Sequence, residues 1–191
     1  MKEFFKKNVM VILAFALPMA LIAGVAFFAY APSLFFSPTY DFLYATCDNG
    51  ASYHTYNCNE YLQKRFSVEN GNLVENYVNP EVDLNNDGKS DGGETYKARI
   101  FLYNAAKNES REIKIEDIKK ISLSDLLTSP EGVTVSNQYD RGADFFPIFG
   151  GSSSYGYYFI KGSSRKKINI INNDGGYYYR GNFQLIGWVL K

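Results

Sequence analysis

The sequence predicts a mainly β protein with one N-terminal transmembrane helix, and three observations favour this fold class. Aromatic residues make up 17% of the 191 residues, including 16 Tyr and 15 Phe, and these side chains favour the pleated surface of a sheet. Several segments after residue 96 alternate apolar and polar side chains between turn-forming residues. Residues 9–31 form one apolar run without a charged side chain. The remaining chain, roughly 150 residues, is long enough for one domain with its own core.

The apolar run predicts a membrane anchor at residues 9–31. A run of about 20 apolar residues matches the hydrocarbon thickness of a bilayer, and transmembrane helices tolerate a proline such as Pro18. Lys2, Lys6 and Lys7 precede the run, and the next basic residue is Lys64. The positive-inside rule therefore places residues 1–8 in the cytoplasm and the domain of residues 32–191 outside it, at the cell membrane.

A cleaved signal peptide is the alternative to this anchor. Ala29, Tyr30 and Ala31 offer a small-x-small cleavage site. However, Pro32 follows this site, and the apolar run exceeds the about 7–15 residues of a signal-peptide core. An uncleaved anchor is therefore the favoured interpretation.

Cys47 and Cys58 are the only cysteines, and the ten residues between them, DNGASYHTYN, are rich in turn formers. Both would lie on the translocated side of the membrane, where disulfides persist. A metal site would need more ligands, and only His54 is nearby. We therefore expect a structural disulfide, worth about 3 kcal/mol in the chain-entropy model for a loop this short.

Residues 83–94 read DLNNDGKSDGGE and fit the calcium-loop pattern D-x-[DN]-x-[DN]-G-x5-E at every required position. Calcium takes about 6–8 oxygen ligands from a chain that wraps tightly around it. Gly88 permits the sharp turn, Lys89 can offer only its backbone carbonyl, and Glu94 closes the site with a bidentate carboxylate. The expected ligands of one Ca²⁺ are Asp83, Asn85, Asp87, Lys89, Asp91 and Glu94.

This segment resembles the calcium loops of EF-hands, dockerins and extracellular thrombospondin type 3 repeats. It departs from the EF-hand at Ser90, where an apolar residue would form the bridge between paired loops, and its flanks do not predict helices. Four carboxylates repel one another in the empty loop, and calcium would relieve that repulsion. A sensor would need a bistable helix pair, so we expect a structural site. A solvated acidic turn is the alternative.

The rest of the chain predicts strands joined by turns. We expect a strand at residues 97–103, a turn at 104–109, a returning strand at 111–115 and a short helix at 116–121. A Ser-Pro-Glu-Gly turn at 129–132 then leads into a strand at 133–135. A second hairpin follows, with a strand at 157–160, a turn at 161–166 and a return at 167–171, and residues 183–190 form the closing strand.

This order of hairpins and strands, with its Ser-Pro-Glu-Gly turn, resembles the blades of TolB-like β-propellers, whose repeats carry a Ser-Pro-Asp-Gly turn. A closed propeller needs about 4–8 blades, and this chain has room for two or three. The expected architecture is therefore an antiparallel meander or a blade-like sheet.

Composition excludes some functions and leaves two open. With 20 basic and 20 acidic residues, the chain lacks the basic excess of a nucleic-acid binder. Nucleophilic catalysis would have to use the single histidine, His54, which lies inside the short predicted disulfide loop. We therefore expect an anchored, non-enzymatic binding module that presents a calcium-stabilised β-surface to a protein or glycan outside the cell. An envelope hydrolase that uses two carboxylates is the alternative. The many tyrosines fit solvent-edge strand positions or a ligand-stacking surface.

Overall fold

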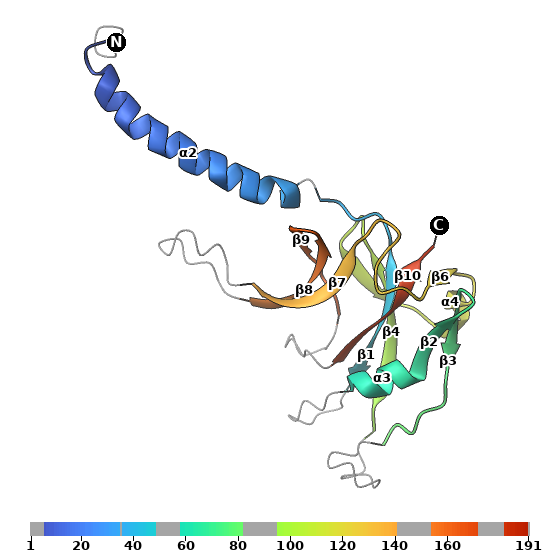
Figure 1. The fold of residues 1–191 in the computed structure, drawn as a ribbon. Coiled ribbons are helices and arrows are strands. Elements are labelled where there is room, and N and C mark those ends of the chain that lie inside the picture. Colours follow the sequence, from blue (N-terminus) through green and yellow to red (C-terminus); the bar gives the residue numbers. More distant parts are fainter. Residues whose placement is uncertain are drawn as a thin grey trace. The chain divides into compact units, whose positions relative to one another are not determined.

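A computed structural model describes residues 6–34, 36–48, 58–81, 95–140, 154–171 and 182–190. The chain forms two compact units, which are treated separately below (Figure 1). The smaller comprises Met1–Phe36 and Gly162–Ser164, and the larger comprises Ser37–Lys161 and Arg165–Lys191. Most of the smaller unit is one helix, whereas the larger unit contains the sheets.

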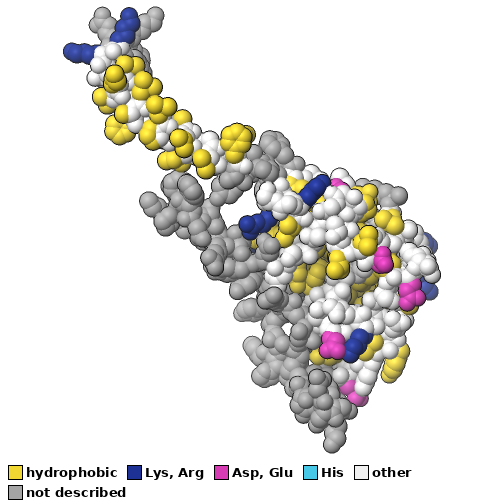
Figure 2. All heavy atoms as spheres, viewed as in Figure 1, with side chains coloured by type: hydrophobic (Ala, Val, Ile, Leu, Met, Phe, Trp, Pro, Cys, Tyr) yellow, Lys and Arg dark blue, Asp and Glu magenta, His cyan; other side chains and the backbone are white. Residues whose placement is uncertain are grey.

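The helix α2, Val9–Leu34, confirms the helix predicted over residues 9–31. Large apolar side chains project from it into solvent, including Met10, Phe15 and Phe28 at 82%, 72% and 79% exposure, and Figure 2 shows such side chains along its visible face. Side chains of this helix are described at positions 9–25, 27 and 28. Over the described residues, no helix is both long and apolar enough to cross a membrane. The predicted helix is therefore confirmed, whereas its placement in a bilayer is not.

The larger unit is built on a five-stranded sheet with the strand order β5-β4-β1-β10-β6. Strand β1 pairs antiparallel with β4 on one side and with β10 on the other. The expectation of a mainly β, antiparallel domain is therefore confirmed. The sheet is not a simple meander, because its first and last strands in the sequence are neighbours at its centre. Its strands are β1 Phe42–Asp48, β4 Lys97–Asn104, β5 Glu109–Glu112, β6 Leu123–Ser124 and β10 Phe183–Val189.

Two smaller sheets and two short helices complete the described part of this unit. The hairpin β2-β3 turns at Asn70 and Gly71. Both residues have the positive φ that a favoured two-residue hairpin turn requires. A three-stranded sheet has the sequential order β7-β8-β9, so the meander expectation holds there. The elements are α3 Asn59–Arg65, β2 Phe66–Glu69, β3 Asn72–Glu75, α4 Ile115–Ile118, β7 Thr134–Asp140, β8 Ser154–Lys161 and β9 Ser164–Lys167.

One face of the five-stranded sheet is largely aliphatic. Successive strand residues point to opposite faces, so Leu43 and Ala45 of β1 share this face with Ile100 of β4. Leu62 of α3 and Ile118 of α4, both fully buried, join the same core cluster. The short helices and the β2-β3 hairpin therefore cover this face.

The opposite face is aromatic and packs against β8. The ring of Phe42 stacks on Tyr103 at 4.7 Å and meets Phe159 of β8 edge-on at 5.8 Å, and Phe159 also stacks on Trp188 at 6.1 Å. Many tyrosines are therefore core residues, and neither the solvent-edge nor the stacking-surface interpretation fits them. Among the described residues, the buried tyrosines are Tyr44, Tyr61, Tyr103, Tyr157 and Tyr158.

Most predicted elements of this unit are confirmed, with shifted ends. The helix expected at 116–121 is only α4, Ile115–Ile118, although Ile118 is buried and Ile121 packs on the core. The return expected at 167–171 is placed too late in the chain, because β9 begins within the predicted turn, at Ser164, and ends at Lys167. The Ser-Pro-Glu-Gly turn is confirmed: Gly132 has φ of +81°, and the amide of Val133 donates to Ser129 Oγ at 3.0 Å.

Candidate functional site

The described residues on the two sides of the predicted calcium loop are paired with each other. Residues 83–94 of the loop, and with them all six expected ligands, lie outside the described residues. The flanking residues Glu81 and Thr95 form an antiparallel bridge, and the amide of Tyr96 donates to the Pro80 carbonyl at 2.7 Å. The segment therefore leaves and rejoins the fold at one point. Closing its ends in advance lowers the entropy cost of wrapping the loop around a ligand.

This stem is packed onto the disulfide region. The ring of Tyr96 stacks on Tyr61 of α3 with centroids 5.1 Å apart. Helix α3 begins immediately after Cys58, which is bonded to Cys47 of β1. The predicted disulfide is thus confirmed, and both cysteines are buried. The stem of the loop, α3 and β1 form one connected structure.

Over the described residues, no group of three or more His, Cys, Asp or Glu side chains is arranged to hold a metal ion. The six expected calcium ligands lie outside the described residues, and so does His54, in an earlier segment of the chain. The calcium site therefore stays a prediction from the sequence.

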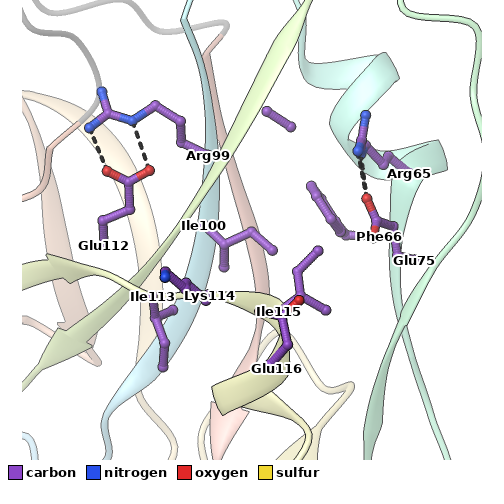
Figure 3. Close-up of a pocket in the computed structure, with 11 residues that line it drawn as sticks. Arg65, Phe66, Glu75, Arg99, Ile100, Glu112, Ile113, Lys114, Ile115 and Glu116 are labelled. Carbon is purple, nitrogen blue, oxygen red and sulfur yellow. Dashed lines mark hydrogen bonds and ion pairs between the residues drawn. The ribbon is translucent and has the colours of Figure 1, made fainter.

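An open pocket of about 530 Å³ lies on the aliphatic side of the larger unit (Figure 3). One wall comes from the end of α3 and the β2-β3 hairpin, and the other comes from β4 and from the segment joining β5 to α4. Figure 3 shows an arginine–glutamate pair on each side of an apolar centre. The lining residues are Arg65, Phe66, Glu75, Ala98, Arg99, Ile100, Glu112, Ile113, Lys114, Ile115 and Glu116.

The pair on the β4-β5 side is bidentate. Arg99 Nε donates to Glu112 Oε1 at 3.2 Å, and Arg99 Nη2 donates to Glu112 Oε2 at 2.7 Å. The Arg99 guanidinium also lies 5.1 Å from the centroid of the Phe101 ring. Parallel hydrogen bonds of this kind fix the orientation of both side chains better than a single contact.

The pair on the hairpin side uses one carboxylate oxygen. Arg65 Nε and Nη2 both donate to Glu75 Oε1, at 3.1 Å and 2.5 Å, and Arg65 Nη1 donates to the Tyr61 hydroxyl. Burial lowers the pKa of Arg65, but the hydrogen bonds to Glu75 and Tyr61 outweigh burial and raise the pKa above its ordinary value. The guanidinium therefore stays charged, and Glu75 keeps its second oxygen, Oε2, outside this pair.

The floor of the pocket is apolar, whereas its rim carries balanced charge. Phe66, Ile100 and Ile113 are each at least nine-tenths buried and form the floor together with Ile115 and Ala98. On this side of the sheet Arg65 and Lys114 balance Glu75 and Glu116, so their formal charges cancel. The side chains of Arg99 and Glu112 lie on the opposite face of the sheet, beside Phe101. Such a pocket favours a ligand with an apolar body and no large net charge.

This pocket could not be predicted from the sequence, because residues from separate segments of the chain form it. The Arg65–Glu75 pair depends on the β2-β3 hairpin, which was not expected, although Asn70-Gly71 between apolar residues is a strong hairpin signal. The Arg99–Glu112 pair lies within the predicted hairpin of residues 97–115, where opposite charges on paired strands signal a cross-strand contact.

No protein-family model matches the chain, and neither the curated proteins nor the solved structures contain a match to it. Its function is therefore inferred from its own residues.

Proposed function

We propose that this chain is a membrane-anchored, calcium-binding protein whose β domain lies outside the cytoplasm and acts as a binding or interaction module. The observation that carries the proposal is the complete twelve-residue calcium pattern at residues 83–94. The paired stem at Glu81 and Thr95 supports it, because a calcium loop must bring its two ends close together.

A structural role for the ion fits the surroundings of the stem. Tyr96 packs on Tyr61, which lies on α3 beside the disulfide. Ordering residues 83–94 around Ca²⁺ would hold Tyr96 in place and thereby stabilise α3. No helix pair that could open and close flanks the stem: it is preceded by irregular chain and followed by β4.

The anchor proposal depends on the composition of α2. Residues 9–31 contain no charged side chain, and the described large apolar side chains of this helix are exposed to solvent. Exposing so many apolar side chains to water is unfavourable, at about 25 cal/mol per Å², and a bilayer would remove that cost. The lysines before the run and the absence of basic residues at 8–63 favour a cytoplasmic N-terminus.

The pocket supports binding rather than hydrolysis. Glu75 and Glu112 have oxygens engaged by arginine guanidinium groups. A glycoside hydrolase needs two carboxyl groups that face the scissile bond, whereas oxygens of both these glutamates are held by guanidinium groups. The apolar floor between these pairs suits recognition of a ligand that is bound and released unchanged.

Titration calorimetry of the full chain in detergent tests the calcium proposal. We expect one Ca²⁺ per chain, with the weak affinity of about 10⁻⁴–10⁻³ M that is common in extracellular modules. Glu94→Gln should weaken binding at least about tenfold, because it removes charge from the closing ligand while keeping its shape. Lys89→Ala is the matched control and should bind like the wild type, because only its carbonyl is a ligand. If the folded wild type produced no calcium heat, residues 83–94 would be an acidic turn.

A further inference from the structure

The pocket beside β4 offers two charged groups outside the ion pairs that frame it. Arg65 uses only Oε1 of Glu75, which leaves Oε2 on the hairpin wall without a hydrogen bond among the described residues. On the other wall, Lys114 lines the pocket, and its ammonium forms no ion pair with another described residue. A ligand would thus meet a hydrogen-bond acceptor at one wall and a cation at the other.

The surface between these groups fits an aliphatic side chain. Phe66 is 5% exposed, so its ring is not a platform on which a sugar could stack. Ile100, Ile113 and Ile115 instead provide branched aliphatic contacts. An apolar side chain buried there would contribute much of the binding free energy, while the charged groups would set its orientation.

We propose that this pocket binds a peptide segment in which an apolar side chain lies between a basic and an acidic residue. The basic residue pairs with Glu75 and the acidic residue pairs with Lys114. In an extended peptide, alternate residues point to the same side, so the three side chains occupy every second position. This assignment extends the proposed function, because it specifies what the interaction module recognises.

The charge balance of the rim favours this ligand over a strongly charged one. The carboxylates of Glu75 and Glu116 would repel a phosphate, and the Arg65 guanidinium and the Lys114 ammonium would repel a polycation. A peptide that carries one charge of each sign matches both walls.

The test measures binding of the acetylated, amidated pentapeptide Lys-Ala-Leu-Ala-Glu, labelled with a fluorophore, to the full chain in detergent with excess calcium. We expect saturable anisotropy change in the submillimolar range. Replacing Leu by Gly in the peptide should weaken binding more than tenfold, because the floor then loses its apolar contact. If the peptide showed no saturable binding at millimolar protein while the same sample still bound calcium by calorimetry, the peptide assignment would be wrong. The calcium proposal would be unaffected by that result.

Reversing the charge of Lys114 tests whether this residue pairs with the acidic residue of the peptide. Lys114→Glu should weaken binding of Lys-Ala-Leu-Ala-Glu at least about fivefold and should be rescued by Lys-Ala-Leu-Ala-Lys. Lys107→Glu is the matched control, because Lys107 lies in the turn at the other end of the β4-β5 hairpin, and it should bind like the wild type. Equal losses in the two variants, or saturable binding of maltopentaose in place of the peptide, would contradict the proposal.

Discussion

Tyr44 is a buried side chain whose hydroxyl is used within the core. Its ring stacks on Phe101 and Phe183 at 5.3 Å and 5.2 Å, and its hydroxyl accepts the amide hydrogen of Ile171 at 2.8 Å. Burial raises the pKa of Tyr44 to about 12. Burial also raises the pKa of Tyr103, and the nearby Tyr44 and Asp41 raise it further by charge repulsion. Both tyrosines therefore stay protonated in the folded state at pH values where they ionise in the unfolded chain.

This difference predicts alkaline destabilisation. Between pH 10 and 12 the unfolded state loses the Tyr44 proton while the folded state keeps it, so the stability present below pH 10 falls as pH rises. The contribution of Tyr44 to that loss is about 2–3 kcal/mol. Tyr44→Phe should cost about 1 kcal/mol at pH 7, through its lost hydrogen bond, and should lose less stability above pH 10.

Urea unfolding at pH 7 to 12, followed by the fluorescence of Trp188, measures this effect, because Trp188 is the only tryptophan and is buried in the aromatic core. Parallel pH dependences for the wild type and Tyr44→Phe would show that Tyr44 does not carry the alkaline transition.

The high tyrosine content also shows a limit of composition. The content of sixteen tyrosines correctly indicated a mainly β fold. A residue count, however, does not say which face of a strand each tyrosine occupies. Tyr103 is buried because Phe159 of β8 covers its face of the sheet. That strand comes from chain more than 30 residues after Tyr103, so no local pattern around Tyr103 could reveal the contact.

At the scale of single elements, local alternation predicted the β4-β5 hairpin but not the β2-β3 hairpin or the order of strands in the sheet. The β4 and β5 strands pair with near neighbours in the chain, and their alternating residues predicted them. Strand β1 was missed, and its partner β10 lies more than 130 residues away. Distant strands pair because their side chains pack in the same core. The pattern of residues in a single sequence does not show which strands share a core. The calcium loop could be predicted from the sequence because all its expected ligands fall within twelve consecutive residues.

Strand β10 contains a glycine that its neighbours require. A Cβ atom on Gly187 would lie 2.5 Å from the Ser124 carbonyl oxygen of β6 and 3.2 Å from Val68 Cγ2. The first contact is with backbone that is itself part of the sheet. Glycine is therefore needed here for close backbone approach.

We expect Gly187→Ala to destabilise the domain by about 1–3 kcal/mol, as overpacking does in other cores. Gly156→Ala in β8 is the matched control, because its nearest contact is the flexible end of Lys167 at 3.2 Å. It should cost less than about 1 kcal/mol. Thermal unfolding of both variants checks the difference, and equal stability losses would mean that the β6-β10 contact relaxes freely.

On the scale of the whole molecule, we propose an anchor joined to a calcium-stabilised domain that one disulfide cross-links. Topology tests the first part. The lysines at positions 2, 6 and 7 predict that protease added outside spheroplasts digests the chain after about residue 32. Digestion should leave a fragment that contains α2 and the N-terminus. Protection of the domain until the membrane is lysed would contradict this orientation.

The second part depends on the coupling between the loop and the fold. The stem at Glu81 and Thr95 continues into Tyr96, which packs on Tyr61 of α3, and α3 is tied to β1 by the disulfide. An ion that orders residues 83–94 should therefore stabilise more than its own loop. Because the disulfide and two packed faces hold the rest of the domain, removing the ion should not unfold it.

The most direct test is the melting temperature of the full chain with calcium and with a chelator, for the wild type and for Glu94→Gln. At a free calcium concentration of about ten times the dissociation constant, mass action adds about 1.4 kcal/mol of stability. For a domain of this size that corresponds to a rise of a few degrees. The account predicts this rise in the wild type, a much smaller rise in Glu94→Gln, and a folded domain in chelator. Identical melting temperatures with and without calcium in the wild type would contradict it.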